Sequence, residues 1–302
     1  MTEERLPAGS AAPGLPRSLR VAAPALFLLL WSCGFVFLKL GLRDADPLTF
    51  LALRYACVVA LLALPCLWLR PPLPARPVAW LHLAMIGLLI QAGYFAFTYL
   101  GLKYGMSAGA MALITSQQPI LVALLAPALA AERVDRMRWL GLALGVAGAT
   151  LVITAKSAIE VSGAMALLFA VLALCAMTAG TLYEKRFGTP VHPVLANTVQ
   201  YAVGLVVTAP LAYLLEPMHV TWSIGLFASL AYLVIGNSLV AISLLLAMIR
   251  HDEASRVSAL FFLVPPATAV VALVVLGEAM PPLAWAGMAV AALGLYVVMR
   301  KR

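Results

Sequence analysis

The sequence predicts an all-α polytopic membrane protein with ten transmembrane helices, arranged as two inverted five-helix repeats. Three observations support this fold class. Of the 302 residues, 64% are hydrophobic and 11% are charged, whereas a soluble domain is about half apolar and about a quarter charged. Apolar runs of membrane-spanning length alternate with short loops, and the chain matches itself at one fixed offset. The composition excludes a soluble protein, a disordered chain and a nucleic-acid binder.

Ten apolar runs have the length of spanning helices rather than of barrel strands, and loops rich in charge and proline separate them. Residues 1–20 are rich in Ala, Pro, Gly and Ser, so we expect a flexible cytoplasmic tail there. A cleaved signal peptide is not expected, because the first apolar run is too long for one. The expected spans, in order, are Val21–Leu40, Leu48–Leu69, Ala79–Leu102, Ser107–Ala130, Met137–Thr154, Gly163–Tyr183, Pro193–Leu215, Trp222–Ile249, Ala254–Leu276 and Leu283–Met299.

Lysine and arginine are distributed unequally between the two sets of loops. Both termini and the loops on their side hold 15 of the 20 Lys and Arg residues. The opposite side holds four, at Lys39, Arg43, Lys103 and Lys156. Because cytoplasmic loops carry the excess of positive charge, both termini are predicted to be cytoplasmic, in a bacterial inner membrane. The net charge of +8 therefore needs no nucleic-acid partner.

An internal duplication relates the two halves at an offset of 146 residues. Each half contains five spans, an odd number, so the second half should enter the membrane from the opposite side. We therefore divide the chain into a tail (1–20), a first repeat (21–156) and a second repeat (157–302). The matched pairs are Lys39 with Lys185, Pro47 with Pro193, Tyr55-Ala56 with Tyr201-Ala202, Pro119 with Pro265, Glu132 with Glu278, Trp139 with Trp285, Gly141 with Gly287 and Gly148 with Gly294.

Several of these residues also carry a resemblance to a known family. Trp31-Ser32-Cys33-Gly34 and Lys39 lie in the first span and Arg54 in the second. Both halves carry a mid-helix proline, a glutamate thirteen residues later, and Trp and Gly opening the last span. Over roughly residues 21–299 the chain resembles the drug/metabolite transporter superfamily, EamA type. Its length and composition are similar to bacterial aromatic amino-acid exporters of the YddG kind. The resemblance implies a substrate cavity among helices 1–4 and 6–9.

Arg54 is the only charge well inside a predicted span, about 10 Å from Pro47 at about 1.5 Å per residue. A charge at that depth faces a cavity or a partner by default. One interpretation is an anchor for a substrate carboxylate. The other is an arginine that extends outward to the interface or pairs with Asp44 or Asp46.

Polar residues recur on single faces of several predicted helices. Gln91, Tyr94, Phe95 and Thr98 follow helical spacing, as do Asn197, Gln200, Tyr201 and Gly204. These faces should point inward, either to line the cavity or to join helices by hydrogen bonds. The residues that we predict to bind substrate are Trp31, Arg54, Gln91, Tyr94, Thr98, Ser116, Gln117, Asn197, Gln200, Tyr201 and Asn237.

Two prolines and two glutamates occupy matching positions in the halves. Pro119 and Pro265 should kink their helices, which either opens the cavity or serves the fold alone. Glu132 and Glu278 lie at predicted helix ends, where they either cap the next helix or form a gating ion pair.

These features predict an inner-membrane secondary transporter with no catalytic residues, metal site or cofactor. The four cysteines and four histidines lack ligand spacing, and no P-loop is present. We expect export of small metabolites, foremost amino acids including aromatic or hydrophobic ones, by alternating access. No carboxylate lies within a predicted span, which favours facilitative or exchange transport. The alternatives are a multidrug or nucleotide-sugar permease and, remotely, a membrane enzyme. Partners are the substrate and membrane lipids, and both a monomer and a dimer are compatible with the sequence.

Overall fold

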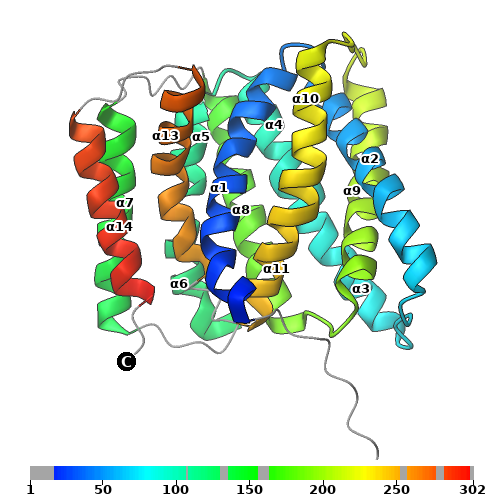
Figure 1. Cartoon of the computed structure of the whole chain (residues 1–302), viewed down its shortest axis with the longest axis horizontal. Coiled ribbons are helices and arrows are strands. Elements are labelled where there is room, and N and C mark those ends of the chain that lie inside the picture. Colours follow the sequence, from blue (N-terminus) through cyan, green and yellow to red (C-terminus); the bar gives the residue numbers. More distant parts are fainter. Residues whose placement is uncertain are drawn as a thin grey trace, which may run out of the picture.

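The computed structural model describes residues 17–106, 108–129, 135–155, 163–251, 257–276 and 282–299. Within these residues every regular element is helical, and the helices form one upright bundle (Figure 1). The predicted all-α polytopic membrane architecture is confirmed. The first helix begins at Arg17, so the last residues of the expected tail belong to it.

The described helices group into ten consecutive segments, four of which combine several elements. The bounds are α1 Arg17–Gly41, α2 Pro47–Leu69, α3 Pro77–Ile86 with η1 Gly87–Phe95 and α4 Ala96–Lys103, α5 Ala108–Thr115 with α6 Gln118–Leu129, α7 Arg136–Ala155, α8 Ala164–Phe187, α9 Pro193–Leu215, α10 Ile224–Tyr232 with η2 Leu233–Ala241 and α11 Ile242–His251, η3 Ala259–Leu263 with α13 Val264–Leu276, and α14 Pro282–Met299.

Six described helices are long and apolar enough to cross a membrane. They are the segments Ala22–Gly41, Pro47–Leu69, Pro77–Lys103, Ala164–Phe187, Pro193–Leu215 and Ile224–Arg250.

The element bounds repeat along the chain at the offset that relates the matched residues. Moving α2 by 146 residues gives the bounds of α9 at both ends, and moving η1 by the same number gives those of η2. Both η1 and η2 are π-helices, in which each turn holds an extra residue. Long π-helical segments are rare, so their recurrence at equivalent positions reflects the duplication.

The fourth segment is interrupted at the position where a kink was expected. A turn at Ser116 and Gln117 separates α5 from α6, and Pro119 lies in the first turn of α6. In the second half, η3 is a 3₁₀-helix and Pro265 follows in the first turn of α13. Proline is tolerated in a first helical turn because the N–H groups there have no intrahelical acceptor.

Helix α2 begins with a proline and obtains its cap from the other half of the chain. Asp46 precedes the helix but makes no side-chain cap. Instead the buried carboxylate of Glu216, at the end of α9, accepts from the Leu48 and Thr49 amides at 3.0 and 2.9 Å. It also lies 3.5 Å from Lys103 Nζ. An anion at a helix N-terminus satisfies amides without partners and complements the helix dipole.

The loop before α2 and the loop after α9 are joined directly. The Asp46 amide donates to the His219 carbonyl at 3.1 Å, and the His219 amide donates to the Asp46 carboxylate at 2.9 Å. Asp44 accepts from the Thr221 amide at 2.6 Å and from the Ser223 hydroxyl at 2.5 Å. These bonds account for both aspartates of the first loop and hold the two halves together at one face.

The bundle is closed by two helix pairs at its opposite ends (Figure 1). Helix α2 packs along α9 at one end, and α7 packs along α14 at the other. Glycines allow the backbones of α7 and α14 to touch. The approach is so close that a Cβ built on Gly294 would lie 2.5 Å from the Gly145 backbone nitrogen. Small residues permit this approach, and van der Waals packing then holds the pair.

We expect Gly294→Leu to lower the melting temperature of the detergent-purified protein. The new side chain has no space between α7 and α14, and overpacking of this kind costs about 1–3 kcal/mol or more. Gly225→Leu is the control, since a Cβ there meets its nearest atom, the Ser223 hydroxyl oxygen, at 3.4 Å. Equal melting temperatures for the two variants would contradict the close packing.

Candidate functional site

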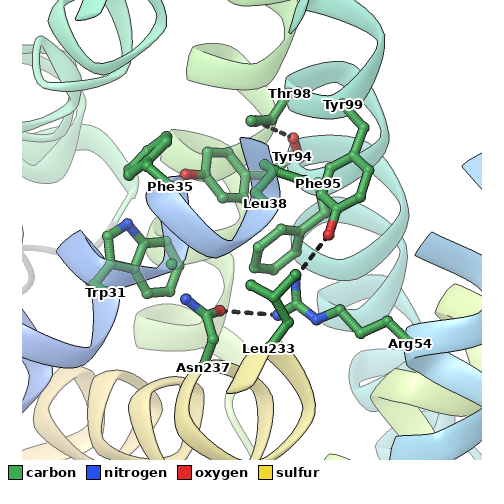
Figure 2. A pocket seen from close by; sticks show the side chains of 11 residues that line it. Trp31, Phe35, Leu38, Arg54, Tyr94, Phe95, Thr98, Tyr99, Leu233 and Asn237 are labelled. Atoms are coloured by element: carbon green, nitrogen blue, oxygen red, sulfur yellow. Dashed lines mark hydrogen bonds between the residues drawn. The ribbon is translucent and has the colours of Figure 1, made fainter. Parts of the chain in front are cut away.

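A pocket lies between α1, the middle of α2 and the two π-helical regions (Figure 2). It encloses about 290 Å³ of empty space, including the part open to solvent. The lining residues are Trp31, Gly34, Phe35, Leu38, Arg54, Tyr94, Phe95, Thr98, Tyr99, Leu233 and Asn237.

One face of α1 forms an apolar wall. Trp31, Gly34, Phe35 and Leu38 follow the i, i+3, i+4, i+7 spacing that places side chains on one side of a helix. The Trp31 ring stacks on Tyr94 with centroids 5.9 Å apart and planes 24° from parallel. The wall therefore presents flat aromatic surfaces to anything that occupies the pocket.

Both π-helical segments contribute to the pocket, but not through matching residues. Tyr94 of η1 lines the pocket and Gln91 does not, whereas Asn237, which matches Gln91 in the repeat, lines it from η2. The irregular backbone obtains partners from two matched tyrosines. Tyr55 donates to the Gln91 carbonyl at 2.6 Å, and Tyr201 donates to the Ser238 carbonyl at 2.9 Å.

Arg54 carries a charge into this site and is only 1% exposed. Its Nε donates to the Ser238 hydroxyl at 2.8 Å, and its Nη2 donates to the Asn237 side-chain carbonyl at 2.8 Å. Its Nη1 donates to the Tyr99 hydroxyl at 3.3 Å (Figure 2). The guanidinium carbon also lies 4.5 Å from the centre of the Phe95 ring, which is a cation–π distance.

All these partners are electrically neutral. Asp44 and Asp46, with which the sequence allowed Arg54 to pair, are bonded to the loop after α9 instead. The buried position also excludes an arginine that extends to the interface. A guanidinium has five N–H donors, and three are used here. Arg54 thus retains donors and charge for a further, anionic partner.

The pocket contains some of the residues predicted from the sequence and omits others. Trp31, Arg54, Tyr94, Thr98 and Asn237 line it. The predicted residues that do not line it are Gln91, Ser116, Gln117, Asn197, Gln200 and Tyr201.

Most of the omitted residues lie where helices pack together. Asn197 donates to the Ser243 hydroxyl at 2.6 Å, as an interhelical bond. Gln91 and Gln200 are fully buried, and neither side-chain amide has a hydrogen-bond partner. Ser116 and Gln117 form the turn that breaks the fourth segment. Gln91 lies in a π-helix, where the regular α-helical spacing that grouped it with Thr98 does not apply, and its role in substrate binding stays a prediction.

Glu132 and Glu278 lie outside the described residues, and the carboxylates that the structure buries are others. One is Glu216, after the end of α9, which lies near Lys103. Glu184, assigned to a loop by sequence, lies inside α8, is 1% exposed and pairs with Arg250 of α11. Both buried carboxylates thus pair with a cation. Lys103 is the last residue of α4, and Arg250 lies next to the last residue of α11.

Several pocket residues were not predicted from the sequence, although helical spacing indicates some of them. Phe35 and Leu38 continue the spacing that begins at Trp31. Tyr99 follows Thr98 by one residue, which does not share a face on a regular helix. Its role depends on Arg54 reaching it across the bundle.

Comparison with known proteins finds transporters over most of the length of the chain. The sequence profile described as the EamA-like transporter family matches residues 21–154 and again residues 164–300. A Salmonella typhimurium protein named a probable amino-acid metabolite efflux pump is 29% identical over 285 residues, covering 90% of this chain and 92% of that protein. An Escherichia coli K12 protein named an uncharacterized inner membrane transporter is 23% identical over 278 residues, covering 91% and 89%, respectively.

A protein of known crystal structure has the same fold. It is 19% identical to this chain, with a TM-score of 0.76, and the match covers 94% of this chain and 98% of that one. At this level of identity the likeness concerns the fold alone.

We expect the pocket wall and the buried glutamines to differ in chemical access. In a background without native cysteines, Phe35→Cys should react with a water-soluble maleimide added to membranes, because the side chain faces the pocket. Gln91→Cys should remain unmodified under the same conditions, because residue 91 is enclosed between η1 and α9. Labelling is measured as a gel shift, and equal labelling of both positions would contradict this placement.

Proposed function

Because this chain belongs to the EamA-like transporter family, we propose that it exports small amino-acid-related metabolites through the pocket around Arg54. It is a membrane transporter rather than an enzyme. Amino acids, including aromatic and hydrophobic ones, are the substrates that we propose first. The likeness to a protein named an amino-acid metabolite efflux pump supports this choice.

The single observation that carries the proposal is the buried charge of Arg54. A cation inside a membrane bundle is costly, so a residue of this kind usually marks a functional site. Arg54 lines a pocket and has only neutral partners among the described residues. A planar guanidinium matches a carboxylate through paired N–H donors. We assign Arg54 as the anchor for a substrate carboxylate.

The walls of the pocket support a substrate with an apolar body. Trp31, Tyr94 and Phe95 line the pocket beside the anchor, with Trp31 stacked on Tyr94 and the Phe95 ring facing the guanidinium. Flat side chains of this kind hold rings or branched aliphatic groups by burial and stacking. Asn237 fixes Arg54 from η2 and positions the anchor.

The duplicated architecture supports alternating access. The element bounds recur at one offset, and each half contributes five helical segments, so the halves would enter the membrane from opposite sides. The pocket takes residues from both halves. We propose that the halves, residues 21–156 and 157–302, rock about this site in a bacterial inner membrane with both termini cytoplasmic.

The distribution of acidic residues supports facilitative or exchange transport. The five described acidic side chains each have a partner away from the pocket, as Glu184 has in Arg250 and Glu216 has in Lys103. Coupled pumps often hold an ionisable carboxylate within their spans as a proton site. The described part of the pocket has no group of that kind.

Reconstitution tests the transport proposal. Proteoliposomes preloaded with labelled phenylalanine or leucine, or with the corresponding 2-hydroxy acids, should release label faster than protein-free liposomes. The rate should not change with an imposed pH gradient, because no proton site lies in the described pocket. Release that follows the gradient would refute facilitative transport, and no release of any of the four compounds would refute the proposed function.

Substitution of the anchor tests the role of Arg54. Arg54→Gln, which introduces the residue that the repeat has at position 200, should reduce carboxylate efflux at least tenfold, because the charge-assisted hydrogen bonds are lost. Arg76→Gln, at an exposed cation before α3, should transport normally. Efflux of an amine without a carboxylate should fall much less in Arg54→Gln, and equal losses for both compounds would indicate a purely structural arginine.

A further inference from the structure

The described lining of the pocket contains one charge, which is positive. Arg54 is its only ionised side chain, and the other lining residues are apolar, aromatic or neutral polar. The described acidic residues nearest in sequence, Asp44 and Asp46, are bonded to the loop after α9. A free amino acid carries both a carboxylate and an ammonium group. The pocket provides a charged partner for the first group only.

Neutral groups could also hold an ammonium, but several of those in the pocket are already engaged. The Asn237 side-chain carbonyl accepts from Arg54, and the Tyr94 backbone carbonyl accepts from Thr98 at 2.7 Å. The ring of Phe95, which could offer a cation–π contact, faces the Arg54 guanidinium. An ammonium that entered the pocket would therefore lose water without gaining a free acceptor among these groups.

Electrostatic repulsion from Arg54 also disfavours an ammonium in the pocket. The ammonium of an α-amino acid is attached to the carbon next to its carboxylate. If Arg54 holds the carboxylate, the ammonium lies within a few ångströms of the guanidinium, and like charges repel strongly away from water. A carboxylate with no ammonium neutralises Arg54 and brings no second charge to desolvate.

We propose that the pocket selects singly charged carboxylates with an aromatic or large apolar body over zwitterionic amino acids. This inference rests on the proposed transport of amino-acid-related metabolites through the pocket, and it ranks these acids ahead of the amino acids themselves. Compounds of this class are the 2-oxo and 2-hydroxy acids that correspond to apolar amino acids. Reactions that supply them are deamination, transamination and the reduction of a 2-oxo acid.

A set of three matched compounds tests the selection. 3-Phenyllactate, phenylalanine and phenylalaninol share a benzyl group and carry, respectively, a carboxylate alone, both charges, and an ammonium alone. Each labelled compound is measured in exchange across proteoliposomes that contain the full-length protein, with the flux through protein-free liposomes subtracted. We expect 3-phenyllactate to exchange at least tenfold faster than phenylalanine, and phenylalaninol to exchange slowest.

The outcomes separate this inference from the proposed function. Phenylalanine that exchanges as fast as 3-phenyllactate, or faster, overturns the inference while leaving a carboxylate-binding transporter in place. Fastest exchange of phenylalaninol overturns both the inference and the role of Arg54. If none of the three compounds, nor leucine or its 2-hydroxy acid, exchanges above the liposome background, the proposed function itself fails.

A variant that changes the charge balance gives an independent test. Asn237→Asp places a carboxylate at the side chain that now lies 2.8 Å from Arg54 Nη2. The pocket then carries no net charge, so the ratio of 3-phenyllactate to phenylalanine exchange should fall at least tenfold. Asn237→Ser is the control, because it changes the same side chain and loses its bond to Arg54 but adds no charge.

The ratio in Asn237→Ser should remain in favour of 3-phenyllactate. Both variants are compared at equal amounts of monodisperse protein, so that a loss of folded protein does not enter the ratio. An unchanged ratio in Asn237→Asp, or an equal fall in both variants, would overturn the charge-balance argument.

Discussion

The guanidinium of Arg54 is buried in an apolar bundle, away from water and lipid. The surrounding structure must therefore supply the hydrogen-bond partners of this charge. Three neutral side chains, from Tyr99, Asn237 and Ser238, accept its hydrogen bonds, and they come from two different helical segments. A buried charge is tolerated when its donors are satisfied. The satisfaction here is partial, because the bonds use three of five donors and leave the charge itself without a counter-ion among the described residues.

The π-helix η2 supplies two of the three hydrogen-bond partners of Arg54, the side chains of Asn237 and Ser238. A membrane span normally satisfies all its backbone groups within the α-helix. The π turns in η1 and η2 depart from that pattern, and Tyr55 and Tyr201 each donate to a carbonyl of such a segment. The same segments line the pocket, η1 through Tyr94 and Phe95 and η2 through Leu233 and Asn237. The irregular backbone and the tyrosines that bond to it therefore occur in both halves beside the site.

The duplication is preserved in the backbone but not in the side chains. Arg54 and Gln200 occupy matched positions on α2 and α9. Arg54 is charged, forms hydrogen bonds and lines the pocket, whereas the neutral Gln200 side chain is buried between helices without a hydrogen-bond partner. Glu216 shows the same asymmetry, because its matched residue is Arg70, an exposed cation at the end of α2. The two halves therefore bring different groups to the pocket.

The sequence by itself determined the membrane environment, the helical class, the approximate bounds of the ten segments and the repeat. Each follows from apolar run length, charge and proline positions, which act locally along the chain. It also singled out Arg54, since a charge inside an apolar run is visible without any fold. Only the tertiary structure decided which polar faces meet at the pocket. Gln91 and Thr98 lie on the same face of an ideal α-helix, but a π turn separates them. The partners of Glu184, Glu216 and Arg54 are distant in sequence, so they depend on how helices pack, and helical periodicity carries no information about that packing.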